Sequence, residues 1–207
     1  MAGLVITVAQ QKGGAGKTTL AVNLAVALRA RGRSVALLDT DPQGSLGRWF
    51  MARRDVLGDP GLDFSTSSAW GVSYECEKLK KIVDVVIIDT PPKVDSDLRP
   101  ALREADLIVV PVAASHVDLW ATEGVLDLAR REGKRPKVVL NRVKRGTRLD
   151  AEVREAAEQL EADLVEASLA HRVVFAETLG QGLGVLEAPR RGLASAEIEA
   201  LLDELLA

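Results

Sequence analysis

A glycine-rich stretch near the beginning of the chain has the residue types that bind phosphate. Residues 10–19 read Gln-Gln-Lys-Gly-Gly-Ala-Gly-Lys-Thr-Thr and follow an apolar run at residues 4–8. The three glycines permit positive φ angles and close backbone approach, so that successive N–H groups can surround phosphate oxygens. Lys17 would contact the β- and γ-phosphates of a nucleotide, and the Thr18 hydroxyl would ligate Mg²⁺. The stretch therefore predicts a nucleotide phosphate site.

This stretch departs from the standard phosphate-loop pattern at one position. The pattern GxxxxGK[ST] has a glycine five residues before Gly16, where this chain has Gln11, and a second lysine, Lys12, follows it. An additional lysine at the mouth of the loop suggests that the charge of the nucleotide is also contacted by a cation from another direction. This departure from the pattern restricts the possible functions of the chain more than the motif itself does.

Two acidic motifs follow later apolar runs of the chain. Asp39 and Asp41 lie two residues apart at the end of one run, where one can serve a Mg²⁺ shell and the other can position an attacking water. The structural alternative for either residue is that it caps a following helix. Asp89 ends the apolar run 85–88 and is typical of a Walker B-type acid that holds Mg²⁺, usually through water.

These motifs converge if the chain folds around a parallel sheet, and its periodicity predicts such a fold. The predicted strands are Leu4–Val8, Ser34–Leu38, Val83–Ile88, Leu107–Val112 and Lys137–Leu140. The predicted helices are Thr18–Arg31, Asp97–Glu104, Asp118–Glu132 and Leu149–Leu160, with a further packed helix at the end of the chain. Apolar strands that alternate with helices indicate a single α/β domain over residues 1–207, with a mostly parallel sheet flanked by helices on both faces. The site is expected beyond the carboxyl ends of the strands. Residues 50–73 are the least regular and are expected to form surface loops around short elements.

Composition excludes several classes of protein. The chain has 207 residues, a net charge of −3 and one cysteine, Cys76. A disulfide framework or a multi-cysteine metal site within one chain is therefore excluded, and global charge does not indicate nucleic acid as a partner. The sequence shows neither a leader-like start nor an apolar run of ~18 residues, so we expect a cytoplasmic location.

The motifs together resemble those of a known family. Lys12–Thr19, Asp39–Gly44 and Asp89–Pro92 look like the nucleotide motifs of the ParA/MinD family of deviant Walker A ATPases, which have a P-loop NTPase fold. Pro111–Asp118 is similar to the family segment P-x-x-P-S-x-x-D, with Ala114 replacing the second proline. By residue type alone, this segment is a strand end followed by S-x-x-D capping of a helix.

The resemblance implies a homodimer that sandwiches two ATP molecules and gives roles to individual residues. The implied catalytic residues are Lys12, which reaches the phosphates bound by the other subunit, Lys17, and Asp41, which positions the lytic water. The implied ATP-binding residues are Gly13, Gly14, Ala15, Gly16, Lys17, Thr18 and Thr19, together with Asn141 and Arg142 near the adenine and Pro189 of a similar turn. The implied Mg²⁺ site consists of Thr18, Asp39 and Asp89.

Other branches of the family fit less well. A MinD-like membrane-associated regulator would end in a basic amphipathic helix, whereas residues 195–207 have only acids on their polar face, so no membrane partner is expected. Relatives that share an iron–sulfur cluster need two cysteines per chain. An ATP-dependent metabolic ligase or amidase remains an alternative, without a substrate motif to support it. Elimination favours the short ParA-like partition ATPases without an N-terminal helix-turn-helix.

That branch implies non-specific DNA binding in the ATP state and a nucleoid-associated location. A local basic surface is therefore expected, although a run of charge is often only a solvated face. The candidate DNA-binding residues are Lys144, Arg145, Arg172, Arg190 and Arg191. The expected function is to segregate or position a cargo, which is a plasmid, a chromosome region or a protein assembly. Slow Mg²⁺-dependent ATP hydrolysis would be stimulated by a ParB-like or cargo-adaptor partner.

Overall fold

The first apolar run of the chain forms the middle strand of the sheet in the computed structural model. Within residues 3–92, 95–189 and 192–207, which the structure describes, seven strands pair in the order β3-β2-β4-β1-β5-β6-β7, and every pairing is parallel. The strands are β1 (Leu4–Val8), β2 (Val35–Asp39), β3 (Asp63–Thr66), β4 (Val85–Asp89), β5 (Leu107–Ala113), β6 (Lys137–Asn141) and β7 (Asp163–Leu164). The interior strands are mostly apolar because both of their faces are covered.

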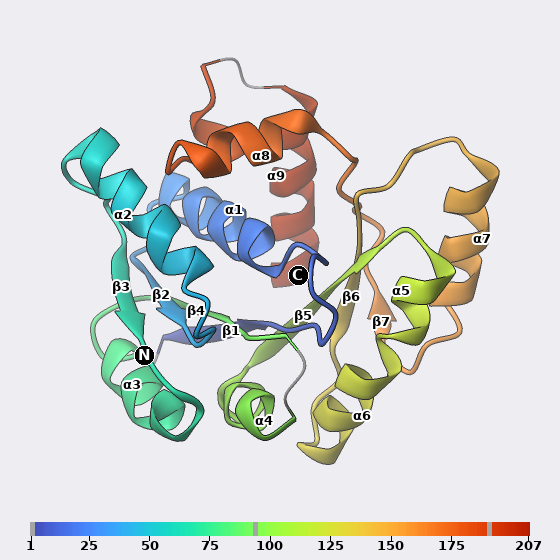
Figure 1. Cartoon of the computed structure of the whole chain (residues 1–207), viewed down its shortest axis with the longest axis horizontal. Coiled ribbons are helices and arrows are strands. Elements are labelled where there is room, and N and C mark those ends of the chain that lie inside the picture. Colours follow the sequence, from blue (N-terminus) through green and yellow to red (C-terminus); the bar gives the residue numbers. More distant parts are fainter. Residues whose placement is uncertain (1–2, 93–94, 190–191) are drawn as a thin grey trace.

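Helices cover both faces of the sheet (Figure 1). The helices are α1 (Lys17–Ala30), α2 (Ser45–Leu57), α3 (Val72–Leu79), α4 (Asp95–Glu104), α5 (His116–Trp120), α6 (Glu123–Arg131), α7 (Arg148–Ala157), α8 (Val173–Gly180) and α9 (Leu193–Leu206), with short 3₁₀ turns η1 (Ala69–Gly71) and η2 (Val185–Glu187). Alternate residues of β1 enter different cores: Ile6 and Val8 pack with α1 and α9, while Val5 packs with α3. The predicted α/β fold with helices on both faces is confirmed.

The register of the central strands brings the acidic motifs together. Val8 of β1 pairs with Asp89 of β4, and Asp89 in turn pairs with Asp39 of β2. Two buried hydroxyls join the strand ends, because Thr40 Oγ1 donates to the Asp89 carbonyl at 2.9 Å and Thr90 Oγ1 donates to the Val8 carbonyl at 2.9 Å. One edge of the sheet therefore carries the phosphate loop and both acidic motifs, as predicted.

The five predicted strands are confirmed to within two residues at their ends, whereas the prediction of one continuous helix over Asp118–Glu132 is wrong, although most of that range is helical. The chain forms α5 and α6 there, with a turn at Ala121 and Thr122. Thr122 is buried, donating from Oγ1 to the Asp118 carbonyl at 2.8 Å and accepting from Gln10 Nε2 at 3.0 Å. This polar contact with the phosphate loop lies at the break between the two helices, and periodicity alone does not reveal it.

The segment expected to consist of surface loops is more regular than predicted. α2 extends to Leu57, and the following residues form β3 at the edge of the sheet. β3 reads Asp-Phe-Ser-Thr, and so it lacks the apolar run by which interior strands are recognised. The expected packed helix at the end of the chain is confirmed as α9, whose Ile198, Leu201 and Leu202 are fully buried. Over the described ranges, helices that could span a lipid bilayer are absent.

Candidate nucleotide-binding site

The phosphate loop joins β1 to α1 and needs glycine at two of its positions. Gly14 and Gly16 have φ angles of 78° and 94°, in the region that side chains with a Cβ disfavour, whereas Gly13 does not use this freedom. Gly16 is also the residue before α1, and a Cβ there would collide with Nδ2 of Asn141. Asn141 Nδ2 donates to the Ala15 carbonyl at 2.9 Å, which ties the end of β6 to the loop.

Lys17 is the first residue of α1, and its side chain is mostly buried beside two carboxylates. Burial lowers the pKa of Lys17, while the nearby charges of Asp89 and Asp41 raise it. A largely desolvated ammonium at a helix N-terminus is a strong partner for phosphate oxygens, because it has lost much of its water and lies in the positive end of the helix dipole.

A short hydrogen bond joins Thr18 to Asp89. Thr18 Oγ1 donates to Asp89 Oδ2 at 2.6 Å, and the other carboxylate oxygen, Oδ1, is buried without a hydrogen-bond partner. Burial raises the pKa of Asp89 to about 7, although the Thr18 hydrogen bond lowers it. A buried carboxylate oxygen without a donor beside a hydroxyl is a fitting pair of oxygen ligands for Mg²⁺.

Mg²⁺ would need ligands in addition to Thr18 and Asp89. In the part of the chain that the structure describes, no group of three or more His, Cys, Asp or Glu side chains is arranged to hold a metal ion. Mg²⁺ is commonly bound by one or two carboxylates together with nucleotide phosphates and waters, so Thr18 and Asp89 suit an ion that arrives with a nucleotide.

Asp39 is engaged by backbone donors, as the capping alternative anticipates. Its Oδ1 accepts from Asp41 N at 3.0 Å and its Oδ2 from Gly47 N, in the first turn of α2, at 3.0 Å. Burial raises the pKa of Asp39 despite these two hydrogen bonds. The residue therefore joins the loop and α2 to the end of β2, and its role as a Mg²⁺ ligand stays a prediction. Asp41 is half-buried in the same loop and faces the hollow above the phosphate loop.

Lys12 forms an ion pair within its own chain. Its Nζ lies 2.8 Å from Oδ1 of Asp118, and the side chains are 35% and 14% exposed. Asp118 is held at the start of α5, where Ser115 is the N-cap and its Oγ accepts from Asp118 N at 3.2 Å. The S-x-x-D capping predicted from the sequence is thereby confirmed, and Asp118 is also the partner of the additional lysine.

Two hollows of nucleotide size adjoin the loop. One, of about 320 Å³, is lined by the phosphate loop together with Asp41 and Arg142. The other, of about 340 Å³, lies between Gly16 and α8 and is lined by Asn141, Arg142 and Phe175 among others. The predicted nucleotide residues 13, 14 and 16–19 line the first hollow, and Asn141 and Arg142 line the second. Arg142 has a positive φ of 55°, and its N–H donates to Asn141 Oδ1 at 2.9 Å.

Of the remaining predicted site residues, Arg172 lines the second hollow, whereas the others are absent from the lining of both hollows or lie outside the described residues. Pro189 is exposed after η2 and does not belong to the described lining of either hollow, so its role stays untested. Lys144 and Arg145 are exposed, and Arg145 and Arg172 both lie against the Glu197 carboxylate, at 3.3 and 2.8 Å. Arg190 and Arg191 lie outside the described residues.

The fold and the loop define a P-loop nucleotide-binding protein with a deviant loop sequence. Residues 6–192 match the family model described as the CobQ/CobB/MinD/ParA nucleotide binding domain. The chain therefore belongs to this family, and it is a ParA/MinD-type protein of a class whose members are ATPases.

Known proteins similar to the chain include both positioning and partition proteins. Maintenance of carboxysome distribution protein A from Halothiobacillus neapolitanus is 30% identical, over 97% of this chain and 95% of that protein. A plasmid partition protein from Borrelia burgdorferi, solved with AMPPNP, is 20% identical, with a TM-score of 0.78 over 99% of this chain and 98% of that one. The cell division ATPase MinD from Pyrococcus furiosus is 21% identical, with a TM-score of 0.81 over 99% and 100%.

Two contributions to the site are not predicted from the sequence, because they depend on distant partners. Asp118 is expected from the sequence only as a helix cap, and no role is predicted for α8, which supplies Phe175 and Leu179 to the hollows. The acidic S-x-x-D segment was a usable signal for Asp118. The short apolar run of α8, in contrast, has no chemical group that points to a nucleotide.

The raised pKa of Asp89 gives a test of its burial in the ligand-free protein. Because its folded pKa is about 7 and the ordinary value is 3.8, the folded chain binds an extra proton between about pH 4 and 7. Stability is therefore lost as pH rises through this window, and above pH 7 the loss is complete. From pH 6 to pH 8, we expect Tm of the unmodified protein to fall by roughly 2–4 °C more than Tm of Asp89→Asn. Equal pH dependence of Tm in the two proteins would show that Asp89 titrates normally.

Proposed function

We propose that the chain is an ATPase that dimerises on binding ATP, binds DNA non-specifically as the dimer, and positions a cargo. The observation that carries the proposal is the place of Lys12. It stands at the mouth of the phosphate loop, paired to Asp118, and is not among the described residues that line its own phosphate hollow. A lysine in that place can serve a nucleotide bound to a second copy, where a cation from outside stabilises the charge that develops during phosphoryl transfer.

The proposed reaction uses this chain's residues in separate roles. The loop N–H groups and Lys17 bind the phosphates, and Thr18 and Asp89 would hold Mg²⁺, which would supply positive charge to polarise them. Asp41, half-buried at the same hollow, orients the attacking water, and Asp39 supports it through the hydrogen bond to Asp41 N. Lys12 leaves Asp118 when the second chain docks and completes the site from the partner's side.

The cargo proposed is a large protein assembly, reached through an adaptor protein. Support comes from the similarity over 95% of the length of a carboxysome distribution protein, whereas the plasmid partition and MinD structures, both below 25% identity, support the fold alone. The same cycle of ATP binding and hydrolysis would also position a DNA cargo through a ParB-like partner. In either case slow hydrolysis, accelerated by the partner, releases the protein from the nucleoid.

The basic surface proposed for DNA lies around Lys144 and Arg145. One carboxylate, that of Glu197, lies against both Arg145 and Arg172, so this group keeps a net positive charge. Lys144 adds an exposed cation beside it, and dimerisation doubles the charge. Phosphate contacts need charge rather than base-reading geometry, so a modest patch suffices for non-specific binding.

Retention of the protein on DNA tests this proposal. With Mg-ATP we expect co-sedimentation with duplex DNA of arbitrary sequence that weakens steeply as salt rises, and with Mg-ADP we expect none. Lys144→Ala should lower the salt slope by about 2 per dimer, one for each lysine. Lys81→Ala, an exposed lysine that follows α3, is the matched control and should leave the slope unchanged. DNA retention that is independent of nucleotide, or retention on anionic vesicles instead, would contradict the proposal.

A further inference from the structure

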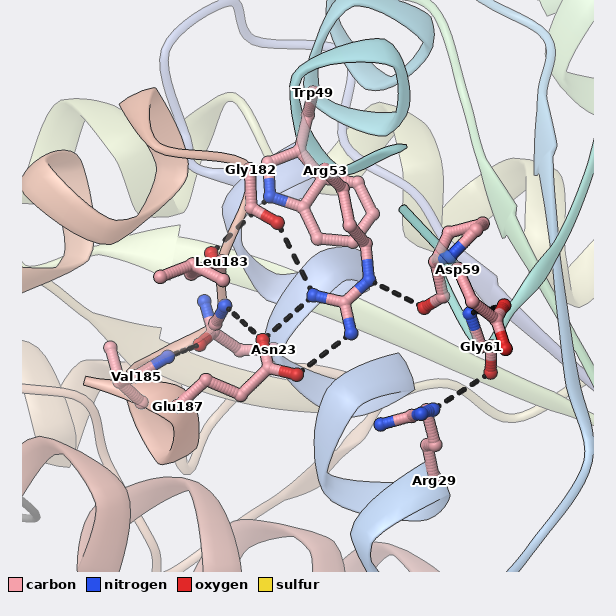
Figure 2. Close-up of polar contacts among 12 residues, drawn as sticks. Asn23, Arg29, Trp49, Arg53, Asp59, Gly61, Gly182, Leu183, Val185 and Glu187 are labelled. Carbon is pink, nitrogen blue, oxygen red and sulfur yellow. Dashed lines mark hydrogen bonds and ion pairs between the residues drawn. The ribbon is translucent and has the colours of Figure 1, made fainter. Parts of the chain in front are cut away.

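The largest fully buried side chain of the described core is an arginine. Arg53 of α2 has no exposed surface, and its guanidinium pairs with both oxygens of Glu187, each at 2.7 Å. Its Nε donates to the Pro60 carbonyl at 2.8 Å and its Nη1 donates to the Gly182 carbonyl at 3.2 Å. The Trp49 ring covers it, with 5.3 Å between the ring centroid and Cζ (Figure 2).

This cluster joins the middle of α2 to the segment that follows α8, and both helices line the nucleotide hollows. Gly182 and Leu183 lie just beyond Gln181, the C-cap of α8, and Trp49 Nε1 donates to the Leu183 carbonyl at 3.3 Å. The backbones meet closely, because Gly182 has a φ of 71° and a Cβ there would collide with the backbone of Arg53. α2 is therefore attached to the end of α8 by side-chain and backbone contacts together (Figure 2).

Other residues of the same two helices lie at the site. Ser45, which begins α2, lines the hollow above the phosphate loop, and Gly47 N is bound to Asp39. Leu179, near the end of α8, lines both hollows. A third connection runs through α1, since Asn23 Oδ1 accepts from Val185 N at 2.8 Å, beside Glu187.

A buried ion pair is a weak source of stability, because desolvation offsets most of its attraction and apolar residues of similar size serve as well. Here the Arg53 guanidinium donates four hydrogen bonds, which connect it to the chain at Pro60, Gly182 and Glu187. We propose that Arg53 is a positioning residue, which holds α2, and with it the Asp41 loop, in register with the α8 wall of the nucleotide hollow. This inference rests on the proposed ATPase function and names how that site is aligned.

Substitution of Arg53 should affect the alignment of Asp41 for hydrolysis but not the binding of ATP. Nucleotide binding depends on the loop and Lys17, which Arg53 does not touch, so Arg53→Lys should keep KM for ATP within about threefold. Water positioning by Asp41 should suffer, so kcat should fall about tenfold. Lysine keeps the charge but lacks the planar fork that makes the paired contacts. The matched control is Arg54→Lys, since the Arg54 side chain is 53% exposed on the same helix.

Trp49 provides a second readout that a structural role alone would not change. A chain with Trp70→Phe and Trp120→Phe, both at exposed positions, keeps Trp49 as its single tryptophan. Mg-AMPPNP should change Trp49 emission in this background and with Arg54→Lys, and the change should fall at least threefold with Arg53→Lys. Glu187→Gln, which keeps the side chain's size at a 22% exposed position, is the second variant should Arg53→Lys fail to fold, and its kcat should fall about threefold.

Each outcome bears on one of the two proposals. A background that neither binds labelled ATP nor hydrolyses it would overturn the proposed function, and this inference with it. A background that hydrolyses ATP while Arg53→Lys and Glu187→Gln keep its kcat would overturn the inference alone. A fall in kcat that is matched by a loss of nucleotide affinity, or a Trp49 response that survives Arg53→Lys, would also overturn it.

Discussion

Lys12→Ala is expected to abolish the ATP-dependent dimer and to lower the rate of ATP hydrolysis by about 10³-fold or more, the range known for cations supplied in trans. Binding of ATP to single chains should persist, because the loop N–H groups and Lys17 are unchanged. Measured together, labelled-nucleotide binding and phosphate release check both parts of this expectation.

A companion variant tests the ion pair of Lys12 from its other side. Asp118→Asn removes the carboxylate that holds Lys12 Nζ at 2.8 Å in the single chain, while keeping an acceptor of the same size. In this variant Lys12 does not have to break an ion pair with residue 118 before it can reach the second chain. The dimer should therefore form at a lower protein concentration. A Lys12→Ala protein that still formed an ATP dimer on DNA would refute the role of Lys12 in trans.

Asp41→Ala is expected to separate binding from hydrolysis. The variant should bind ATP, dimerise and stay on DNA, while hydrolysis falls about 10²- to 10⁴-fold, the usual contribution of a group that orients or deprotonates the attacking water. Asp55→Ala is the matched control, since Asp55 is an exposed acid farther along the same chain segment, on α2. Single-turnover release of phosphate measures the effect, and normal turnover in Asp41→Ala would remove this residue from its role.

The nucleotide motifs were predictable because each is local. The sequence from β1 through the loop to α1 contains the strand, the glycines and the Lys17–Thr18 pair in one continuous segment. Asp89 could be placed because an acid at the end of an apolar run meets the phosphate loop whenever the two strands are parallel neighbours. The prediction of the fold followed from the same alternation of apolar runs and helices.

The connections between segments were not predictable, because they depend on residues that are distant in sequence. Arg53 and Glu187 lie 134 residues apart, and α2 carries further arginines that give it the composition of a solvated helix. Likewise, the turn between α5 and α6 carries a hydrogen bond of Thr122 with Gln10 of the phosphate loop, 112 residues away in sequence. Such contacts leave no periodic or local mark, and only the assembled sheet brings them together.

The molecular mass of the unmodified protein in solution shows whether ATP converts single chains into a dimer. Light scattering in Mg-ADP should give the 22.2 kDa of one chain, and light scattering in Mg-AMPPNP should give twice that mass. The mass of a single chain with both nucleotides, or twice that mass with both, would contradict ATP-dependent dimerisation.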